Sequence, residues 1–248
     1  MKSKRILIGV LSVIFVAVVI IAVFMMFTIK EVNVKFSVYS DSVNTIELQE
    51  KFNKYNGENL IFLDAKEISK KVDVGPRFEI ESVKKSYPNV LEINVKERKE
   101  RFVISLSSGD YIISDQGYVL GTATGEEKLV RINLSGISVN DVVLGQKIIT
   151  DHDEDFYNAL TLADVEGVVD ASNEMTVEYV GKTLRSVIFL TKTDVRIRIP
   201  MATEYGVEKT QTGFSAYFNE SRDYIKSYSE IRVDIQPDGT LKTVWIQQ

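Results

Sequence analysis

The chain has 248 residues, of which 44% are hydrophobic and 26% are charged. This is the composition of a globular protein and excludes a disordered or polytopic membrane chain. There is no cysteine and a single histidine, His152, so disulfide frameworks, thiol nucleophiles and Cys/His zinc sites are excluded. Three basic residues lie among the first five, which leaves 27 basic against 35 acidic side chains and a net charge of −8 for the rest. That acidic balance argues against a nucleic-acid partner.

Residues 6–29, which follow a basic tail of residues 1–5, contain no charged side chain. As a helix they would span about 36 Å, enough to cross a hydrocarbon core of roughly 30 Å. A cleaved signal peptide is the alternative, but its apolar region is typically about 7–15 residues long and ends at small residues. This run ends in Phe24-Met25-Met26-Phe27. We therefore expect a single transmembrane helix, with a cytoplasmic N-terminus because the basic flank stays inside.

Residues 30–98 show the pattern of a small domain in the order β-α-α-β-β. A strand is expected near residues 29–37, where apolar and polar residues alternate. Two helices are expected from capping boxes, and two strands flank a turn. The boxes pair Asn44 with Glu47 and Asp64 with Glu67, and the turn is Tyr87-Pro88-Asn89.

Two segments carry a resemblance to a known family. The run GENLIFLD (Gly57–Asp64) and the element order resemble a POTRA domain, and VKKSYPNVLEINVKER (Val83–Arg98) is similar to the signature of the FtsQ/DivIB family of bacterial cell-division proteins. The resemblance implies an α+β chain with a transmembrane helix, a POTRA domain over residues 30–98 and a β-rich domain over residues 99–248. The motif identifies a family without marking a catalytic site.

The distal segment, residues 99–248, carries 15 basic and 23 acidic side chains and predicts short strands separated by turns. Helices are expected near residues 154–164, after an Asp151/Glu154 capping box, and near residues 214–226. The sequence Pro237-Asp238-Gly239 is a strong turn signal before the last strand. The expected strands are Phe102–Leu106, Tyr111–Ile113, Tyr118–Leu120, Leu129–Leu134, Val142–Leu144, Met175–Val180, Leu184–Leu190, Val195–Ile199, Ile231–Ile235 and Leu241–Ile246.

The sequence gives little support to catalysis. His152 lies at an expected helix start with no marked nucleophile, and the acidic run around it lacks the glycine and terminal glutamate of a calcium loop. No phosphate-binding glycine motif is present. We therefore expect no enzyme, cofactor or metal. The alternative is a membrane-anchored extracytoplasmic cell-wall hydrolase or peptidase, which requires convergent carboxylates or an activated serine. An assembly factor bearing a POTRA domain is a further alternative.

The C-terminus is the candidate binding surface. Aromatic residues, which are enriched at interface hot spots, crowd the last part of the chain, and a terminal strand is often an edge strand open to pairing. The resemblance implies that this strand binds bitopic coiled-coil division proteins of the FtsB/DivIC-like and FtsL-like kind. A proline at Val244 is expected to remove a backbone donor and abolish association while leaving the fold largely intact. The expected binding residues are Leu241, Lys242, Thr243, Val244, Trp245, Tyr224 and Tyr228.

The function that the resemblance implies is that of a non-enzymatic scaffold at the division septum. Such a chain would be held in the cell membrane by residues 6–29 and would bind other anchored division proteins outside the cytoplasm.

Overall fold

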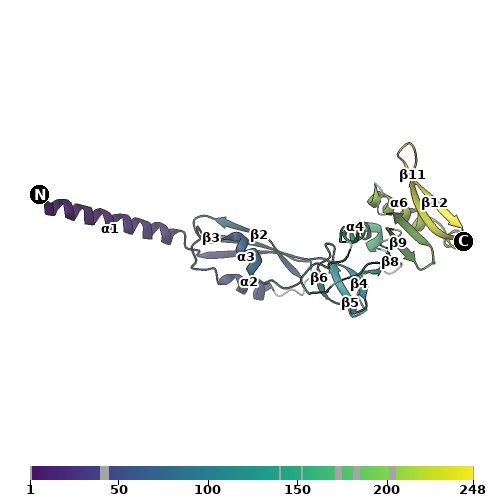
Figure 1. The fold of residues 1–248 in the computed structure, drawn as a ribbon, viewed down its shortest axis with the longest axis horizontal. Helices are drawn as coiled ribbons and strands as arrows, with labels where there is room; N and C mark the ends of the chain where they lie inside the picture. Colours follow the sequence, from purple (N-terminus) through teal and green to yellow (C-terminus); the bar gives the residue numbers. More distant parts are fainter. Residues whose placement is uncertain are drawn as a thin grey trace. The chain divides into compact units, whose positions relative to one another are not determined.

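The computed structural model describes residues 2–39, 45–139, 141–151, 153–170, 175–180, 185–200 and 205–247. The chain divides into two compact units, residues 1–97 and 98–248. Figure 1 shows their elements. The expected cap at Asn44 and the side chain of His152 lie outside the described residues.

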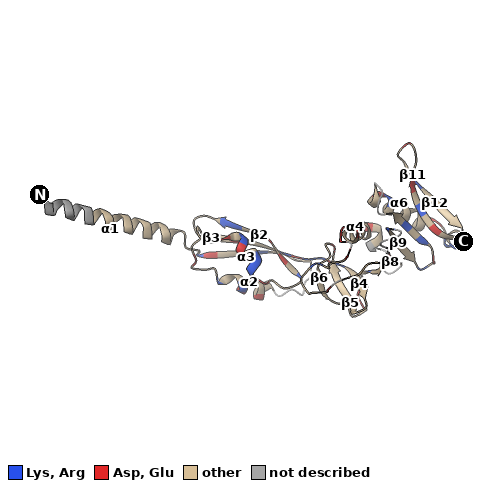
Figure 2. Cartoon of the chain, in the orientation of Figure 1, with Lys and Arg blue, Asp and Glu red and all other residues tan. Residues whose placement is uncertain are grey.

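The first unit begins with helix α1 (Lys2–Met26). Residues 11–26 of this helix are exposed. They carry no charged side chain, as the tan colour of this part of the helix in Figure 2 shows. Counting only the part of the chain that is described, no helix has both the length and the hydropathy needed to span a membrane.

After α1 the unit has the predicted β-α-α-β-β order. Strand β3 lies in the centre of a three-stranded sheet, parallel to β1 and antiparallel to β2. Its residues Leu91, Ile93 and Val95 are fully buried, because every second side chain of a strand faces the same side. The elements are β1 (Glu31–Ser37), α2 (Thr45–Asn53), α3 (Ala65–Lys71), β2 (Phe78–Ser86) and β3 (Val90–Glu97).

The start of α3 follows from a capping residue. The carboxylate of Asp64 accepts a hydrogen bond from the backbone N–H of Lys66 at 2.8 Å, which satisfies one of the free donors of the first turn. The cap at Asp64 is therefore confirmed, with its hydrogen bond at Lys66 rather than at Glu67 of the expected capping box. Glu67 forms an ion pair with Lys71 at 3.0 Å one turn further along the helix.

The second unit is built on a nine-stranded mixed sheet in the order β12-β11-β10-β9-β8-β7-β4-β5-β6. Its strands are β4 (Glu100–Leu106), β5 (Gly109–Ser114), β6 (Val119–Thr122), β7 (Val130–Ser135), β8 (Met175–Val180), β9 (Ser186–Thr191), β10 (Arg196–Pro200), β11 (Tyr228–Ile235) and β12 (Leu241–Gln247). Its helices are α4 (Asp153–Ala163), α5 (Glu166–Asp170), α6 (Gly206–Asn219) and α7 (Arg222–Ile225).

Helices α4 and α6 pack against the sheet and enclose the main core. Phe156 on α4 and Phe214 on α6 are buried, and the ring of Phe214 meets that of Phe189 on β9 edge-on, with 4.8 Å between centroids. The approach of α6 is close because Gly213 faces the sheet. A Cβ at that position would lie 2.8 Å from Ile197 Cγ2.

Two expectations in this unit are wrong. Residues 142–144 form no strand, since Val143 and Leu144 are exposed and lead into a turn at Gly145. The helix expected near 214–226 starts eight residues earlier as α6, ends at Asn219, and is followed by the separate short helix α7. The apolar pattern does not predict the first part of α6, because its buried positions are occupied by Lys209, Thr210 and Gly213.

Candidate functional site

Strand β12 is the last strand at one end of the nine-stranded sheet, and it pairs only with β11 among the described residues. The two strands form a hairpin with Ile231 opposite Trp245 and Ile235 opposite Leu241. In the turn between them Gly239 has φ of 83°, which suits glycine. The Gln236 N–H donates to Thr240 O at 2.8 Å and so fixes the register of the ladder.

That turn bond also decides which backbone groups of β12 are free. In an antiparallel ladder, opposite residues alternate between pairs that exchange hydrogen bonds and pairs that do not. Because Gln236 bonds to Thr240, the next bonded pairs of the register are Asp234 with Lys242 and Arg232 with Val244. The N–H and C=O groups of Leu241, Thr243 and Trp245 therefore point away from β11, toward the open edge.

The five expected strand residues divide between two faces of the sheet. Thr243 and Trp245 are opposite the buried Val233 and Ile231, so their side chains face the core, and Leu241 and Trp245 pack against it. Lys242 and Val244 lie on the other face, where both are exposed. The structure thus places all five residues on the edge strand, but only Leu241, Thr243 and Trp245 direct backbone groups outward, and the side chains divide between two faces.

Three aromatic residues come together beside this edge. The rings of Tyr224 on α7, Tyr228 at the start of β11 and Trp245 on β12 are mutually in contact, with centroids 4.9 to 5.5 Å apart. The Tyr224 and Tyr228 hydroxyls share a hydrogen bond of 3.0 Å, and the pKa of Tyr224 is raised, first by this hydrogen bond and then by desolvation. We call Tyr224, Tyr228 and Trp245 the aromatic cluster. Tyr217, by contrast, is buried and bonded to Thr193 at 2.9 Å.

The sheet face that carries Lys242 and Val244 also holds a group of paired charges, which no sequence motif predicted. Glu230 on β11 is buried and accepts hydrogen bonds from Arg232 at 2.5 Å and from Arg198 on β10 at 3.1 Å. Burial alone would raise the pKa of Glu230, but the two guanidinium groups outweigh it and hold the pKa below its usual value. Alternating charges in the sequences of β10 and β11 were the available signal.

At the opposite edge of the sheet, the start of β6 is paired with another segment. The backbone of β6 and the turn before it bond to residues 145–148, through Val119 N to Gln146 O at 2.9 Å and Ile148 N to Gly117 O at 3.0 Å. Gly117 is pressed against Tyr157, whose ring would lie 2.6 Å from a Cβ at that position. The Tyr157 hydroxyl in turn donates to Ile148 O at 2.6 Å. Residues 145–148 are therefore held against β6, and the two edges of the sheet differ.

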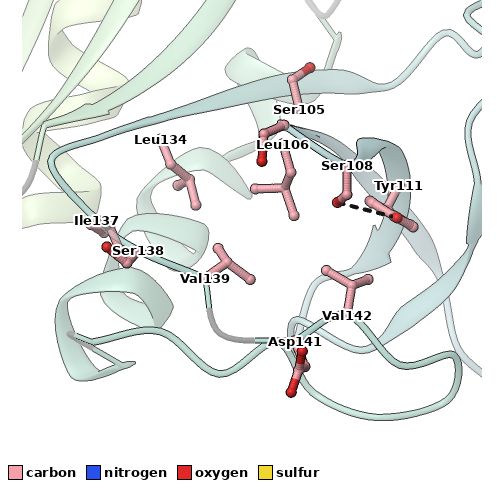
Figure 3. A pocket seen from close by; sticks show the side chains of 11 residues that line it. Ser105, Leu106, Ser108, Tyr111, Leu134, Ile137, Ser138, Val139, Asp141 and Val142 are labelled. Atoms are coloured by element: carbon pink, nitrogen blue, oxygen red, sulfur yellow. Dashed lines mark hydrogen bonds between the residues drawn. The ribbon is translucent and has the colours of Figure 1, made fainter.

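The second unit also has a cavity of about 560 Å³ between the β4–β5 hairpin and residues 134–142. Apolar side chains of Leu106, Leu134 and Val139 are directed into it, and Ser108 accepts a hydrogen bond from the Tyr111 hydroxyl at 3.4 Å, as Figure 3 shows. Serine hydroxyl groups also line this cavity, so it is the place to look for the activated serine that a hydrolase would need.

The carboxylate that is hydrogen-bonded to Ser105, that of Asp110, is poorly suited to act as a base. Asp110 lies opposite Ser105 in the β4–β5 ladder and forms an ion pair with Arg131 at 2.8 Å. Hydrogen bonds from Arg131 and Ser105 lower the pKa of Asp110 below its usual value. A general base for hydrolysis works best with a pKa near the operating pH, so this arrangement does not favour serine activation.

Comparison with known proteins agrees with this architecture. A family model described as a POTRA domain of the FtsQ type matches residues 27–98. Cell division protein DivIB of Clostridium botulinum is 24% identical in strain Hall and 25% identical in strain Loch Maree, each over 240 residues that cover 96% of this chain and 91% of the relative. Cell division protein DivIB of Clostridium acetobutylicum is 28% identical over 122 residues, 49% of this chain and 48% of the relative.

The fold and these matches define a POTRA-bearing protein with a separate, β-rich second unit. The match at residues 27–98 and the similarity to DivIB proteins over 96% of the chain support the FtsQ/DivIB resemblance that the motif at residues 83–98 predicted.

Proposed function

We propose that this protein is a non-enzymatic scaffold of bacterial cell division that binds a membrane-anchored division protein by accepting a β-strand on the open edge of β12. The observation that carries the proposal is the position of β12 at the end of the sheet with one row of backbone groups directed outward. Its relatives bear the name of a cell division protein.

The contrast between the two sheet edges supports this proposal. An unpaired edge is a hazard, because it can pair with any extended segment, and proteins usually cover it. Here residues 145–148 bond to Val119, the first residue of β6, whereas no described segment pairs with the outer side of β12. The longer open edge of β12 fits a strand that receives a partner.

The aromatic cluster gives the edge a side-chain anchor. Strand addition supplies affinity through backbone hydrogen bonds, and neighbouring side chains supply specificity. Tyr224 is 42% exposed and lies against Trp245, so a partner strand on β12 would meet aromatic surface next to its backbone ladder. Tyrosine and tryptophan are the residues most enriched at binding hot spots. The family resemblance suggests an extended segment of an FtsB/DivIC-like protein, in complex with an FtsL-like protein, as the strand donor.

Residues 6–29 are proposed as the membrane anchor, with a cytoplasmic N-terminus and the two units outside. Supporting observations are the uncharged sequence, the helical conformation of residues 2–26 and the exposed apolar side chains of residues 11–26. Anchoring partners in one bilayer raises their effective concentration, so individually weak contacts suffice for assembly at the septum. A C-terminal reporter fusion active only in the cytoplasm would contradict this orientation.

The test uses a matched pair at Thr243. Thr243→Pro removes an outward N–H that the hairpin does not use, whereas Thr243→Ala removes the side chain and keeps the donor. In co-purification of the tagged full-length chain from its own cell membranes, we expect Thr243→Pro to lose the bitopic division proteins and Thr243→Ala to retain them. Retention of these proteins by both variants would contradict strand addition.

The proline expected at Val244 is a poor test, and the register explains why. The Val244 N–H points toward Arg232, so proline there would break the hairpin itself. Loss of binding by that variant would not distinguish an altered edge from a misfolded one.

A further inference from the structure

The end of α1 is tied to the POTRA domain by backbone hydrogen bonds. The Leu60 N–H donates to Phe27 O and the Ile29 N–H donates to Glu58 O, both at 2.8 Å. The side chain of Asn59 donates to Phe24 O at 2.9 Å, within the last turn of the helix. The domain therefore follows the helix without a flexible linker.

Large apolar side chains from two loops gather at this junction. Phe62 stacks on Phe24 of α1 with 5.6 Å between ring centroids, and Tyr87 meets Phe27 edge-on at 5.8 Å. We call Phe24, Phe27, Ile61, Phe62 and Tyr87 the aromatic collar. Lys85 lies beside it and donates to Ile61 O at 3.1 Å.

The side chains of the aromatic collar are exposed, although contact with water is unfavourable for apolar side chains. Phe62 is 73% exposed, Tyr87 is 60% exposed and Ile61 is 44% exposed. The Phe62–Phe24 contact joins this apolar surface to α1, where Met25 and Met26 are also exposed. Residues 11–26 of α1 carry no charge (Figure 2). An apolar patch that is continuous with an apolar helix calls for the same surroundings as that helix.

We propose that the aromatic collar inserts into the interfacial layer of the lipid bilayer and fixes the POTRA domain against the membrane surface, an inference that rests on the proposed anchoring of residues 6–29. Aromatic rings at the ends of membrane helices favour the headgroup level, where an apolar ring and a polar group are both accommodated. Interfacial apolar side chains reach about 5–10 Å into the boundary between headgroups and acyl chains. Phe62 and Tyr87 come from two different loops, so the contact would hold the domain at two points beside the helix.

The test places a single tryptophan in the collar. The full-length chain carries Trp245→Phe, which removes its one natural tryptophan, together with Phe62→Trp, and is reconstituted in phosphatidylcholine/phosphatidylglycerol liposomes. Lipids brominated on the acyl chain near the glycerol are expected to quench emission by about half or more, since the side chain would lie at that depth. Ile46→Trp in the same background is the control, because Ile46 is 71% exposed but lies at the other end of α2 from the junction. Its emission is expected to be unchanged by the brominated lipid.

A second probe, Tyr87→Trp in the same background, keeps the result independent of any one loop. Quenching at positions 62 and 87, with none at 46, supports the proposal. Flotation of the chain with the liposomes without quenching at 62 and 87 would overturn the collar and leave the proposed anchor and scaffold intact. Quenching at only one of the two positions would overturn the collar as a single surface. A chain that fails to float with the liposomes would overturn the anchor and the collar together.

Discussion

Trp245 meets Tyr224 edge-on, with 5.5 Å between ring centroids and 77° between ring planes. One ring belongs to the terminal strand and the other to α7, so the contact joins the proposed docking strand to the helical layer of the second unit. Edge-to-face pairs stabilise by about 0.5–1.5 kcal/mol beyond the area that they bury.

Replacing Trp245 should therefore affect both folding and binding. We expect Trp245→Ala to lower the free energy of unfolding by about 1–3 kcal/mol, since the side chain is only partly buried. Val244→Ala, on the exposed face of the same strand, should stay within about 0.5 kcal/mol. Denaturant unfolding of the two variants measures the difference. Equal effects would show that the aromatic cluster does not hold the strand.

The charged group around Glu230 predicts a pH effect. Because its folded pKa lies below the usual 4.5, the carboxylate contributes stability that is present above that pH and is lost as the pH falls below it. At neutral pH we expect Glu230→Gln to be less stable by about 1–3 kcal/mol, since two arginines lose a charged acceptor. The gap to the unsubstituted chain should narrow below pH 4.5 in thermal unfolding. A gap independent of pH would contradict the assignment.

Two helical glycines form a matched pair for the packing of α6. In Gly213→Ala the new methyl group would lie 2.8 Å from Ile197 Cγ2, whereas in Gly167→Ala of α5 the nearest atom is Phe214 Cβ at an ordinary 3.8 Å. Alanine usually stabilises a helix relative to glycine by about 0.8–1.0 kcal/mol. We expect that gain at 167 and a loss of about 1–3 kcal/mol at 213, because overpacking must push α6 from the sheet. Melting temperatures of the two variants should move in opposite directions.

The helix cap in the POTRA domain gives a test that does not involve the second unit. Asp64→Ala removes the acceptor for the Lys66 N–H and should cost about 1 kcal/mol in the unfolding of the first unit. Asp64→Asn keeps an acceptor at the same place and should cost only a few tenths of a kcal/mol. Hydrogen exchange of the α3 amides would report the effect locally. Identical protection in the two variants would show that the cap is not what starts α3.

The sequence predicts the parts of the fold that depend on local patterns. The β-α-α-β-β order, the Asp64 cap and the final hairpin follow from alternation, capping and turn chemistry, and all are present. Helix α6 was partly missed because Lys209, Thr210 and Gly213 fill its buried side. Residues 142–144 looked like a strand because three apolar residues in a row carry no period that separates strand from loop.

The candidate site depends on facts that no local pattern contains. That β12 is last in the sheet depends on the order of nine strands, and that the start of β6 is paired depends on residues 145–148 returning to it. Which amides point outward depends on the hydrogen bond from Gln236 to Thr240, which sets the phase of the whole ladder. The contact of Tyr224 with Trp245, 21 residues away in sequence, likewise exists only in three dimensions.

Residue-by-residue amide exchange of the full-length chain, alone and in the complex isolated from its own membranes, tests strand addition at β12 most directly. The proposed edge predicts that the amides of Thr243 and Trp245 exchange rapidly in the free chain and become strongly protected in the complex, while those of Lys242 and Val244 are already protected in both by pairing with β11. Unchanged rapid exchange at Thr243 and Trp245 in a complex that still holds its division partners would contradict the account.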